Sequence, residues 1–357
     1  LVAELVAHPP ARREVLVANS ERFRSLALAE RLVDAAFEAR FADPAETVAL
    51  GRLALAVLAA LDRAFYGERR IADVEGRAWV EVGSGLRIGD DLVAAEAAFA
   101  EAERRLAGTT DPAAEAGRLH ALSSLRKDQR RFLAAEELLA RAAELYEEVG
   151  DDERRARVLT GLGSLHLDRG EPEAARPPLL EAMRLVDPLG DPRTALFIRH
   201  NLALSLVETG RADEAERVFR AGFEAYAEAD RWTRLKGRWL AALLAVAAGR
   251  DAEAEAALVE IEAAYAEGDR PYDAALAALD LAGLYARQRR DGELKALARR
   301  LVPLFASHGI HREAITALAF FLQAAERERA SVEVVDRVAG FLKRARLDPT
   351  LRFRTAG

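Results

Sequence analysis

No cysteine occurs in the 357 residues of the sequence, which excludes disulfides, thiol nucleophiles and thiolate metal sites. Long apolar runs are also missing, since none approaches the roughly 20 residues that a membrane-spanning helix needs. The first seven residues are apolar, but they include Glu4 and follow no basic leader, so a signal peptide is not expected. We therefore expect a cytoplasmic protein with no membrane partner. Because the chain begins with leucine rather than methionine, we also expect it to be part of a longer protein.

An excess of positive charge is absent as well. The 52 basic residues are outnumbered by 59 acidic ones, so the formal net charge of −7 predicts no nucleic-acid partner. The six histidines show no serine–histidine–carboxylate arrangement, and we assign no catalytic residue and no cofactor. His308 and His311 have a spacing that suits a metal, but no third ligand is near them in the sequence, so no metal site is predicted.

The sequence does have a strict period. One small residue recurs at intervals of 40, 40, 40, 39 and 40, and leucine replaces it in the last copy. The marked positions are Ala95, Ala135, Ala175, Ala215, Ala254 and Leu294. A fixed period of this size indicates stacked repeat units rather than one globular core.

The clearest unit begins at Leu159, where large residues recur at i, i+3 and i+7 as on one face of a helix. Gly163 is small where a neighbouring helix must come close, and Gly170 allows the left-handed backbone of a tight turn. Ala175 and Ala182 then place small faces of a second helix against the first. The unit is therefore predicted to be an antiparallel helix pair.

This pattern resembles the tetratricopeptide repeat, which has Trp, Leu-Gly and Tyr on its first helix and Ala, Phe and Ala on its second. One copy matches it at Trp79, Gly83, Ala95, Phe99 and Ala102, and another at Leu202, Ala203, Ala215 and Phe219. The period exceeds the usual length of about 34 residues. It is similar to the long-repeat class of kinesin light chains, maltose-type activators and peptide-sensing regulators. The resemblance implies an all-α fold, a right-handed superhelix (α-solenoid) of about seven antiparallel helix pairs.

The chain also resembles, more diffusely, bacterial repeat proteins that carry an anti-sigma-type zinc finger upstream. That likeness implies a regulatory role involving a sigma factor. No such finger lies within these residues, which contain no cysteine.

The expected organisation follows the period from end to end. A tail with a short helix is expected over 1–19, a divergent capping pair over 20–66, six repeat-like pairs over 71–306, a C-terminal capping pair over 311–346 and a tail over 347–357. Ser20 is expected to cap the first long helix, with Phe37 on its apolar side, and Asp43 to cap the second. Leu351 and Phe353 are expected to fold back on the C-terminal cap.

Two adjacent prolines oppose this reading of the repeat. Pro177 and Pro178 fall inside the second helix of the Leu159 unit, after Pro172. A proline inside a helix loses a hydrogen bond and clashes one turn back, which costs about 3 kcal/mol or more. We therefore predict that this helix is bent or starts late.

In tetratricopeptide repeats, side chains of the first helix of each pair line a concave groove, and the resemblance implies which residues do so here. The implied lining residues are Arg77, Ser84, Arg87, His120, Ser124, Lys127, Asp128, Arg157, Thr160, Ser164, Asp168, Phe197, His200, Leu204, Glu208, Lys236, Trp239 and Leu243. The first half of this set is cationic and rich in hydroxyls, and the second half is apolar and aromatic. It suits a protein or peptide with an acidic end and an apolar anchor. The alternative is that these are ordinary solvated helix faces.

Asn201 stands at a motif position where peptide-binding repeats often use asparagine to hold the ligand backbone. Its amide has both a donor and an acceptor, which match a peptide unit, but it could equally bridge two neighbouring helices. The cluster Arg126, Lys127, Arg130 and Arg131 could likewise be a docking patch for an acidic surface or a solvated turn.

The function predicted from the sequence is a non-catalytic scaffold that binds a protein or peptide, as the regulatory or recruiting part of a larger protein. Three alternatives stay open. The stack could be a ligand- or peptide-gated sensor that controls a missing effector domain, the regulatory arm of an enzyme such as a protease, or a self-associating module. The oligomeric state is left open.

Overall fold

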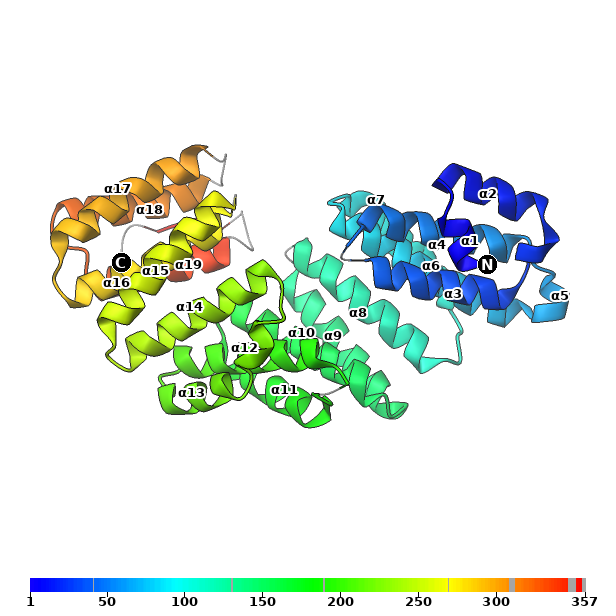
Figure 1. The fold of residues 1–357 in the computed structure, drawn as a ribbon, viewed down its shortest axis with the longest axis horizontal. Coiled ribbons are helices and arrows are strands. Elements are labelled where there is room, and N and C mark those ends of the chain that lie inside the picture. The colour runs from blue at the N-terminus through cyan, green and yellow to red at the C-terminus, as the bar shows by residue number, and fades with distance from the viewer. Residues whose placement is uncertain are drawn as a thin grey trace. The chain divides into compact units, whose positions relative to one another are not determined.

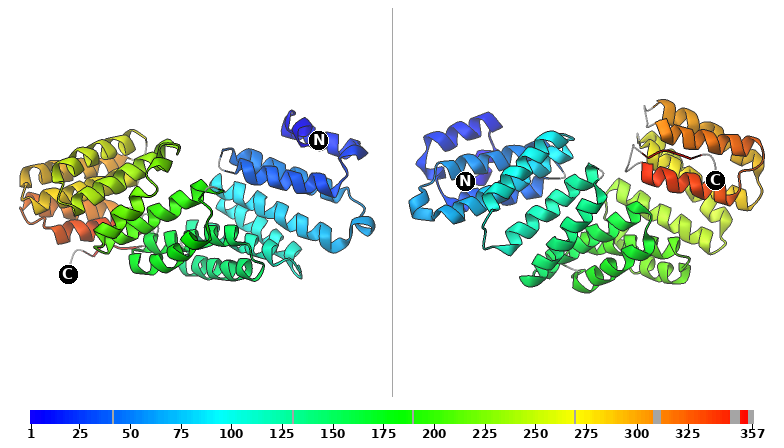
Figure 2. Two further views of the ribbon diagram at one scale, coloured as in Figure 1. Left: turned by 60° about the horizontal axis from the view of Figure 1, so that its bottom comes forward. Right: turned by 180° about the vertical axis from the view of Figure 1, so that it is seen from behind.

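The structure is a computed structural model, described for residues 1–40, 42–129, 131–188, 190–268, 270–307, 312–345 and 351–354. All regular secondary structure in these ranges is helical, which confirms the all-α prediction. The chain divides into two compact units, Leu1–Val158 and Leu159–Gly357, and each is described by itself. Figure 1 labels the helices, and Figure 2 gives two further views of them.

The first unit is a stack of antiparallel helix pairs. Its helices are α1 (Val2–Val6), α2 (Pro10–Asn19), the 3-10 helix η1 (Glu21–Phe23), α3 (Leu26–Ala39), α4 (Pro44–Ala59), α5 (Arg63–Tyr66), α6 (Glu68–Ile88), α7 (Leu92–Leu106), α8 (Pro112–Asp128) and α9 (Phe132–Glu148). Helices α3 and α4, α6 and α7, and α8 and α9 pack as pairs, and α6 also packs on α4. Helix α10 (Asp152–Arg169) contains the boundary with the second unit.

Two details of the first long helices differ from expectation. The Ser20 side chain makes no capping hydrogen bond, and η1 follows it, so α3 starts later, where Ser25 Oγ accepts from the backbone N–H of Leu28 at 3.3 Å. Phe37, expected on the buried side, is 50% exposed. The Asp43 cap of α4 is confirmed, because Asp43 Oδ1 accepts from the backbone N–H of Glu46 at 3.0 Å with Pro44 at the first helical position.

The second unit continues with pairs but ends differently. Its helices after α10 are α11 (Pro172–Leu185), α12 (Pro192–Glu208), α13 (Ala212–Arg220), the 3-10 helix η2 (Glu224–Tyr226), α14 (Arg231–Ala247), α15 (Asp251–Glu267), α16 (Pro271–Arg287), α17 (Asp291–Ser307), α18 (Arg312–Glu326) and α19 (Val332–Ala345). Helix α16 packs on α15 and α17 and also on α19, the last helix. The tail folds back as expected, since the Phe353 ring lies 5.0 Å from that of Phe341.

Close contacts between helices depend on small residues at the repeat positions. A Cβ at Gly163 of α10 would lie 2.4 Å from Cγ of Leu179 in α11, which confirms that the two helices come close there. The turn after each first helix recurs with the period: Gly170, Gly210 and Gly249 have φ of 75°, 73° and 71°. Arg289 holds the same place one repeat later with φ 54° and has no such freedom.

The proline-containing helix starts where the pattern places it. Helix α11 begins at Pro172, at the first helical position, and runs without a break through Pro177 and Pro178 to Leu185, so the prediction of a late start is wrong. The first position of a helix tolerates proline because its N–H would have no partner there. Pro178 is buried in the helix face that also carries Ala175 and Leu179, and this packing offsets part of the lost hydrogen bonding.

The second helix of the next pair is shorter than expected. Helix α13 ends at Arg220, whereas the period predicts a helix to about 228. A turn and η2 follow, and they bring Tyr226 against α14 at Gly237, where a Cβ would lie 2.5 Å from Tyr226 Cδ1. Gly222 lies in this turn, and a Cβ there would lie 2.9 Å from Cδ of Arg199. Helix α13 is therefore about two turns shorter than expected, and the ring of Tyr226 packs between this helix pair and the next one.

Candidate ligand-binding surface

In the first unit, α3 joins α6 and α8 in one polar surface, although the sequence assigned α3 to a cap. Arg40 Nη2 donates to both carboxylate oxygens of Glu81 at 2.8 and 2.7 Å, and Arg77 lies 3.5 Å from Asp34. We call these residues, with Arg87 and His120, the α3–α8 surface. The Arg40–Glu81 separation of 41 residues recurs in Arg87–Asp128, a regularity in the sequence that could have revealed the missed residues.

The cations predicted to receive an acidic ligand already have acidic partners. Arg87 Nη1 lies 2.6 Å from Asp128 Oδ2, and Arg157 Nη2 lies 2.6 Å from Glu153 Oε1 one helical turn away. With the Arg77–Asp34 pair, three of the predicted cations are neutralised by side chains within the unit. The net positive charge of this surface is therefore smaller than the sequence pattern implies.

Two predicted lining residues have altered properties in the folded chain. Ser84, expected in the groove, is instead 2% exposed, because α6 packs between α4 and α7. His120 is half-buried, and burial lowers its pKa to about 4, with smaller contributions from the positive charges of Arg40 and Arg157. The imidazole is therefore neutral at pH 7. Ser124 and Lys127, on the same helix, are half-buried.

In the second unit, the predicted residues of α12 and α14 form one partly open surface, which we call the α12–α14 surface. Its members are Phe197, His200, Asn201, Leu204, Lys236 and Trp239. All are half-buried except Lys236, which is exposed. Thr160 and Ser164, on α10, are also half-buried.

Hydrogen bonds fix two rings of the α12–α14 surface. His200 Nδ1 lies 2.9 Å from Tyr226 Oη, and burial lowers the pKa of His200 to about 4, so a neutral imidazole shares this hydrogen bond with the tyrosine hydroxyl. Trp239 Nε1 donates to Asp280 Oδ2 at 2.7 Å. Burial raises the pKa of Asp280 to about 6, against the opposing effects of Lys343 and of this hydrogen bond. Both rings are thus positioned before any ligand arrives.

Asn201 is different, because its side chain makes no hydrogen bond to any residue that the structure describes. The alternative reading, in which this amide bridges two neighbouring helices, therefore has no support within the described part of the chain. Neither the donor nor the acceptor of this half-buried amide is used by a described residue.

The surface ends at α16, because α19 covers that helix. In α12 and α14 the repeat leaves Leu204 and Leu243 half-buried, but the equivalent position in α16 is Gly283, and Val335 of α19 lies 3.9 Å from where its Cβ would be. Nearly all residues of α16 from Asp273 to Tyr285 are buried. A helix that is apolar on every side belongs in a core. Of the three helices α12, α14 and α16, α12 and α14 are therefore left open.

In the basic cluster at the turn after α8, Arg126 has a structural role, since it links α8 to α7. Arg126 donates through Nη1 and Nη2 to both carboxylate oxygens of Glu96 on α7, at 2.5 and 2.8 Å. These hydrogen bonds lower the pKa of Glu96 to about 2. Arg130 lies outside the described residues. The bidentate pair fixes α8 against α7, which weakens the docking-patch interpretation.

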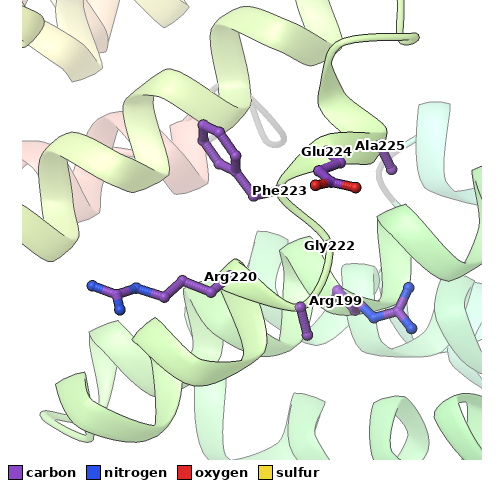
Figure 3. Close-up of a pocket in the computed structure, with 7 residues that line it drawn as sticks. Arg199, Arg220, Gly222, Phe223, Glu224 and Ala225 are labelled. Carbon is purple, nitrogen blue, oxygen red and sulfur yellow. The ribbon is translucent and has the colours of Figure 1, made fainter.

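A cavity of about 470 Å³ opens where α13 stops, lined by residues 220–225 and Arg199. In Figure 3 the side chains of Arg199 and Arg220 point away from each other, so no polar groups converge on one point. Phe223 is 59% exposed beside it. Ligand sites normally combine enclosure with a few convergent polar groups, so this cavity is not the candidate site.

Other site classes find no support among the described residues. Within them, no group of three or more histidine, cysteine, aspartate or glutamate side chains is placed to hold a metal. His308 and His311 lie outside the described residues. In the same ranges, none of the helices combines the length and the apolar character that crossing a membrane requires.

Comparison with known proteins agrees with the repeat assignment. Residues 116–187 match the family model of the Tetratricopeptide repeat. No curated protein sequence matches the chain. Among solved structures, the chain is similar to a Rap protein in complex with Competence and Sporulation Factor, with 13% identity, a TM-score of 0.64 and coverage of 90% of this chain and 88% of that one. It is also similar to the apo form of RapI, with 12% identity, a TM-score of 0.52 and coverage of 74% and 98%.

At these identities the structural likeness concerns the fold alone, and that fold is the tetratricopeptide-repeat type predicted from the sequence. The likeness to regulators with an upstream zinc finger stays a prediction.

Proposed function

We propose that the chain is a non-catalytic scaffold that binds a peptide, or a peptide segment of a protein, along the α12–α14 surface. The observation that carries the proposal concerns the side-chain amide of Asn201 on the α12–α14 surface. Its amide has no hydrogen-bond partner among the described residues, and it lies between Phe197 and Leu204 at i−4 and i+3 on one face of α12. An available amide between apolar neighbours suits a ligand backbone with apolar side chains on either side of it.

The proposal has two further supports. The rings of His200 and Trp239 are held by hydrogen bonds to Tyr226 and Asp280, so little ordering cost falls on the scaffold when a ligand binds. A Rap protein of similar fold was solved with Competence and Sporulation Factor, which is a precedent for ligand binding by this architecture.

The apolar anchor of the predicted ligand is better supported than its acidic end. Leu204 and Trp239 are half-buried and reachable, whereas Arg87 and Arg157 are already ion-paired. Reversing the charges of Arg87, Lys127 and Arg157 together tests the acidic end directly. If partner affinity and helicity are both unchanged, the acidic end is rejected.

The test of the main proposal is a selection of peptides that bind the intact chain from a random displayed library, followed by affinity measurements on variants. We expect Asn201→Ala and Trp239→Ala each to weaken binding about tenfold or more, which corresponds to about 1.4 kcal/mol. Asn19→Ala is the matched control, because Asn19 is the other asparagine of the chain and donates only to the Val15 carbonyl of its own helix. Equal affinity for the wild type and Asn201→Ala would reject the assignment.

A regulatory role within a larger protein remains part of the proposal. It is tested by sequencing the complete gene and by identifying partners that the intact chain retains from its own cell extract. Partners that bind equally well to Asn201→Ala and Trp239→Ala would have to use another surface.

A further inference from the structure

At one end of the α12–α14 surface, the carboxylate of Glu208 is ion-paired with a lysine of the same chain, Lys343. Asn201, Leu204 and Glu208 are spaced i, i+3 and i+7 and lie along one face of α12. Glu208 Oε1 accepts from Nζ of Lys343 at 2.7 Å. Lys343 belongs to α19 and follows Glu208 by 135 residues, so this ion pair joins the last helix to the ligand-binding surface.

A second carboxylate acts on the same ammonium group. Asp280 of α16 accepts a hydrogen bond from the indole N–H of Trp239 at 2.7 Å, and the positive charge of Lys343 opposes the rise in the pKa of Asp280. Burial alone would lower the pKa of Lys343, but attraction by Glu208 and Asp280, with a smaller contribution from Asp336 of α19, raises it. The neighbourhood of this single ammonium therefore carries an excess of negative charge.

The Lys343 side chain is more exposed than the apolar face of the helix that carries it. Its side chain is 44% exposed, and partly exposed ion pairs contribute little to stability. The apolar residues of α19, by contrast, are buried: Val335, Val338, Phe341, Leu342 and Ala345. The lysine side chain can therefore swing out while α19 stays packed on α16.

We propose that Glu208 and Asp280 form a cation subsite at the end of the α12–α14 surface, and that Lys343 occupies it until a basic group of the ligand replaces it. The inference rests on the proposed peptide binding and names the ligand class: a peptide with an apolar segment followed by a lysine, an arginine or a free amino group. An acidic group at this place would meet two carboxylates, so the polarity required here is opposite to that expected from the first unit.

The experiment uses the full chain as wild type, Lys343→Met, Lys343→Met/Glu208→Gln and the control Lys295→Met. Lys295 of α17 forms a similar ion pair with Glu328, in the turn after α18, at 2.7 Å, so the control also removes one paired lysine from the second unit. The probes are acetyl-Ala-Leu-Ala-Leu-Lys-amide and the same peptide with norleucine in place of lysine. Affinity is measured by calorimetry, and the Trp239 indole N–H signal, assigned with Trp239→Phe, reports binding at the surface.

We expect the lysine peptide to bind Lys343→Met at least tenfold more tightly than the wild type or Lys295→Met. The norleucine peptide should show no such gain, and adding Glu208→Gln should remove it. Each variant is checked by circular dichroism and thermal unfolding. Because methionine can fill the space of the lysine stem, a second variant, Lys343→Gln, repeats the test with a polar side chain.

Three results would overturn the cation subsite. One is an equal gain for both peptides in Lys343→Met, since that gain would come from space rather than charge. Another is no gain for either peptide in Lys343→Met or Lys343→Gln. The third is a gain that survives Glu208→Gln. If both peptides shift the Trp239 signal equally in every variant, the subsite is wrong while the proposed peptide-binding surface stands, so the two failures are distinguishable.

Discussion

Replacing Gly163 by alanine tests the closest approach between two helices of a repeat. An added Cβ would lie 2.4 Å from Cγ and 2.6 Å from Cδ2 of Leu179, about 1 Å closer than two carbon atoms pack without strain. Leu179 is fully buried in a cluster with Ala175, Leu202 and Leu206, so its side chain has no open space into which to move. We therefore expect overpacking, which costs about 1–3 kcal/mol.

The helix itself would gain from the same substitution. Alanine is better than glycine in a helix interior by about 1 kcal/mol, so the net loss for Gly163→Ala is about 0–2 kcal/mol. Gly283→Ala is the matched control, since it also lies inside a helix of the second unit but its nearest neighbour, Val335 Cγ1, is 3.9 Å from the added Cβ. There we expect a gain of up to about 1 kcal/mol.

The assay is urea unfolding followed by circular dichroism, with the change in midpoint compared between the two variants. Two units need not unfold together, so hydrogen exchange of α10 and α11 checks that the loss is local to the repeat. Opposite signs for the two substitutions support the close contact. If Gly163→Ala is as stabilising as Gly283→Ala, the approach of α10 to α11 is not as described.

Three further predictions concern single positions in the second unit. Arg289→Gly should raise the free energy of unfolding by about 0.5–1 kcal/mol, because φ at this position is 54°, a left-handed conformation that glycine adopts more easily than arginine. Thermal unfolding is the measurement, and a lower midpoint in the variant would contradict the prediction. Pro177→Ala should stabilise α11 by about 1–3 kcal/mol, because Pro177 is exposed and contributes little packing, and slower amide exchange in α11 is the measurement. Asp280→Asn should make the chain more stable at pH 7, by up to about 3 kcal/mol. The pKa of the Asp280 carboxyl rises from 3.8 to about 6 on folding, so this group stabilises the fold at pH 4 and loses that contribution as the pH rises through 6. Asparagine does not ionise, so the variant avoids that loss. Urea unfolding between pH 4 and 7.5 should show a smaller pH dependence in Asp280→Asn than in the wild type, and equal slopes would contradict the shift.

The helix pairs were predictable because the period acts directly on backbone geometry. Gly163, Gly170 and Ala175 each meet one local requirement, and the structure uses each of them as that requirement predicts. Helix starts were less certain, because two serines five residues apart both satisfy the capping rule. Only the packing of η1, whose Phe23 is buried, selects Ser25 over Ser20.

The surface residues were harder to predict because they depend on which helix covers which. Asp34, Arg40 and Glu81 were missed, since the divergent pattern before 67 gave no reason to place α3 beside α6. Arg40 and Glu81 nevertheless stand 41 residues apart, as Arg87 and Asp128 do, and the comparison of such pairs would have found them. Ser84 illustrates the opposite error, since the motif position alone cannot report that α6 is packed on two sides.

The covering of α16 did have a signal in the sequence. Between Ala274 and Tyr285 only Asp280 is polar, so no face of this helix is suited to water. A regular repeat would have exposed one face to the groove, and the missing polar face predicts a further element against it. The amphipathic segment 332–345 supplies that element as α19, which is why the last helix reaches back to α12.

Repeat proteins offer nearly the same surface on every unit, so recognition has to come from the positions where the units differ. In the second unit α19 covers α16, and the proposed ligand therefore lies on α12 and α14. On those two helices the repeat leaves apolar residues such as Leu204 and Leu243 in equivalent places, which give affinity without direction. Asn201 occurs once on these helices, and so does the ion pair of Glu208 with Lys343 of α19. They mark one position and one end, so they are the residues that can fix the register and orientation of a bound peptide.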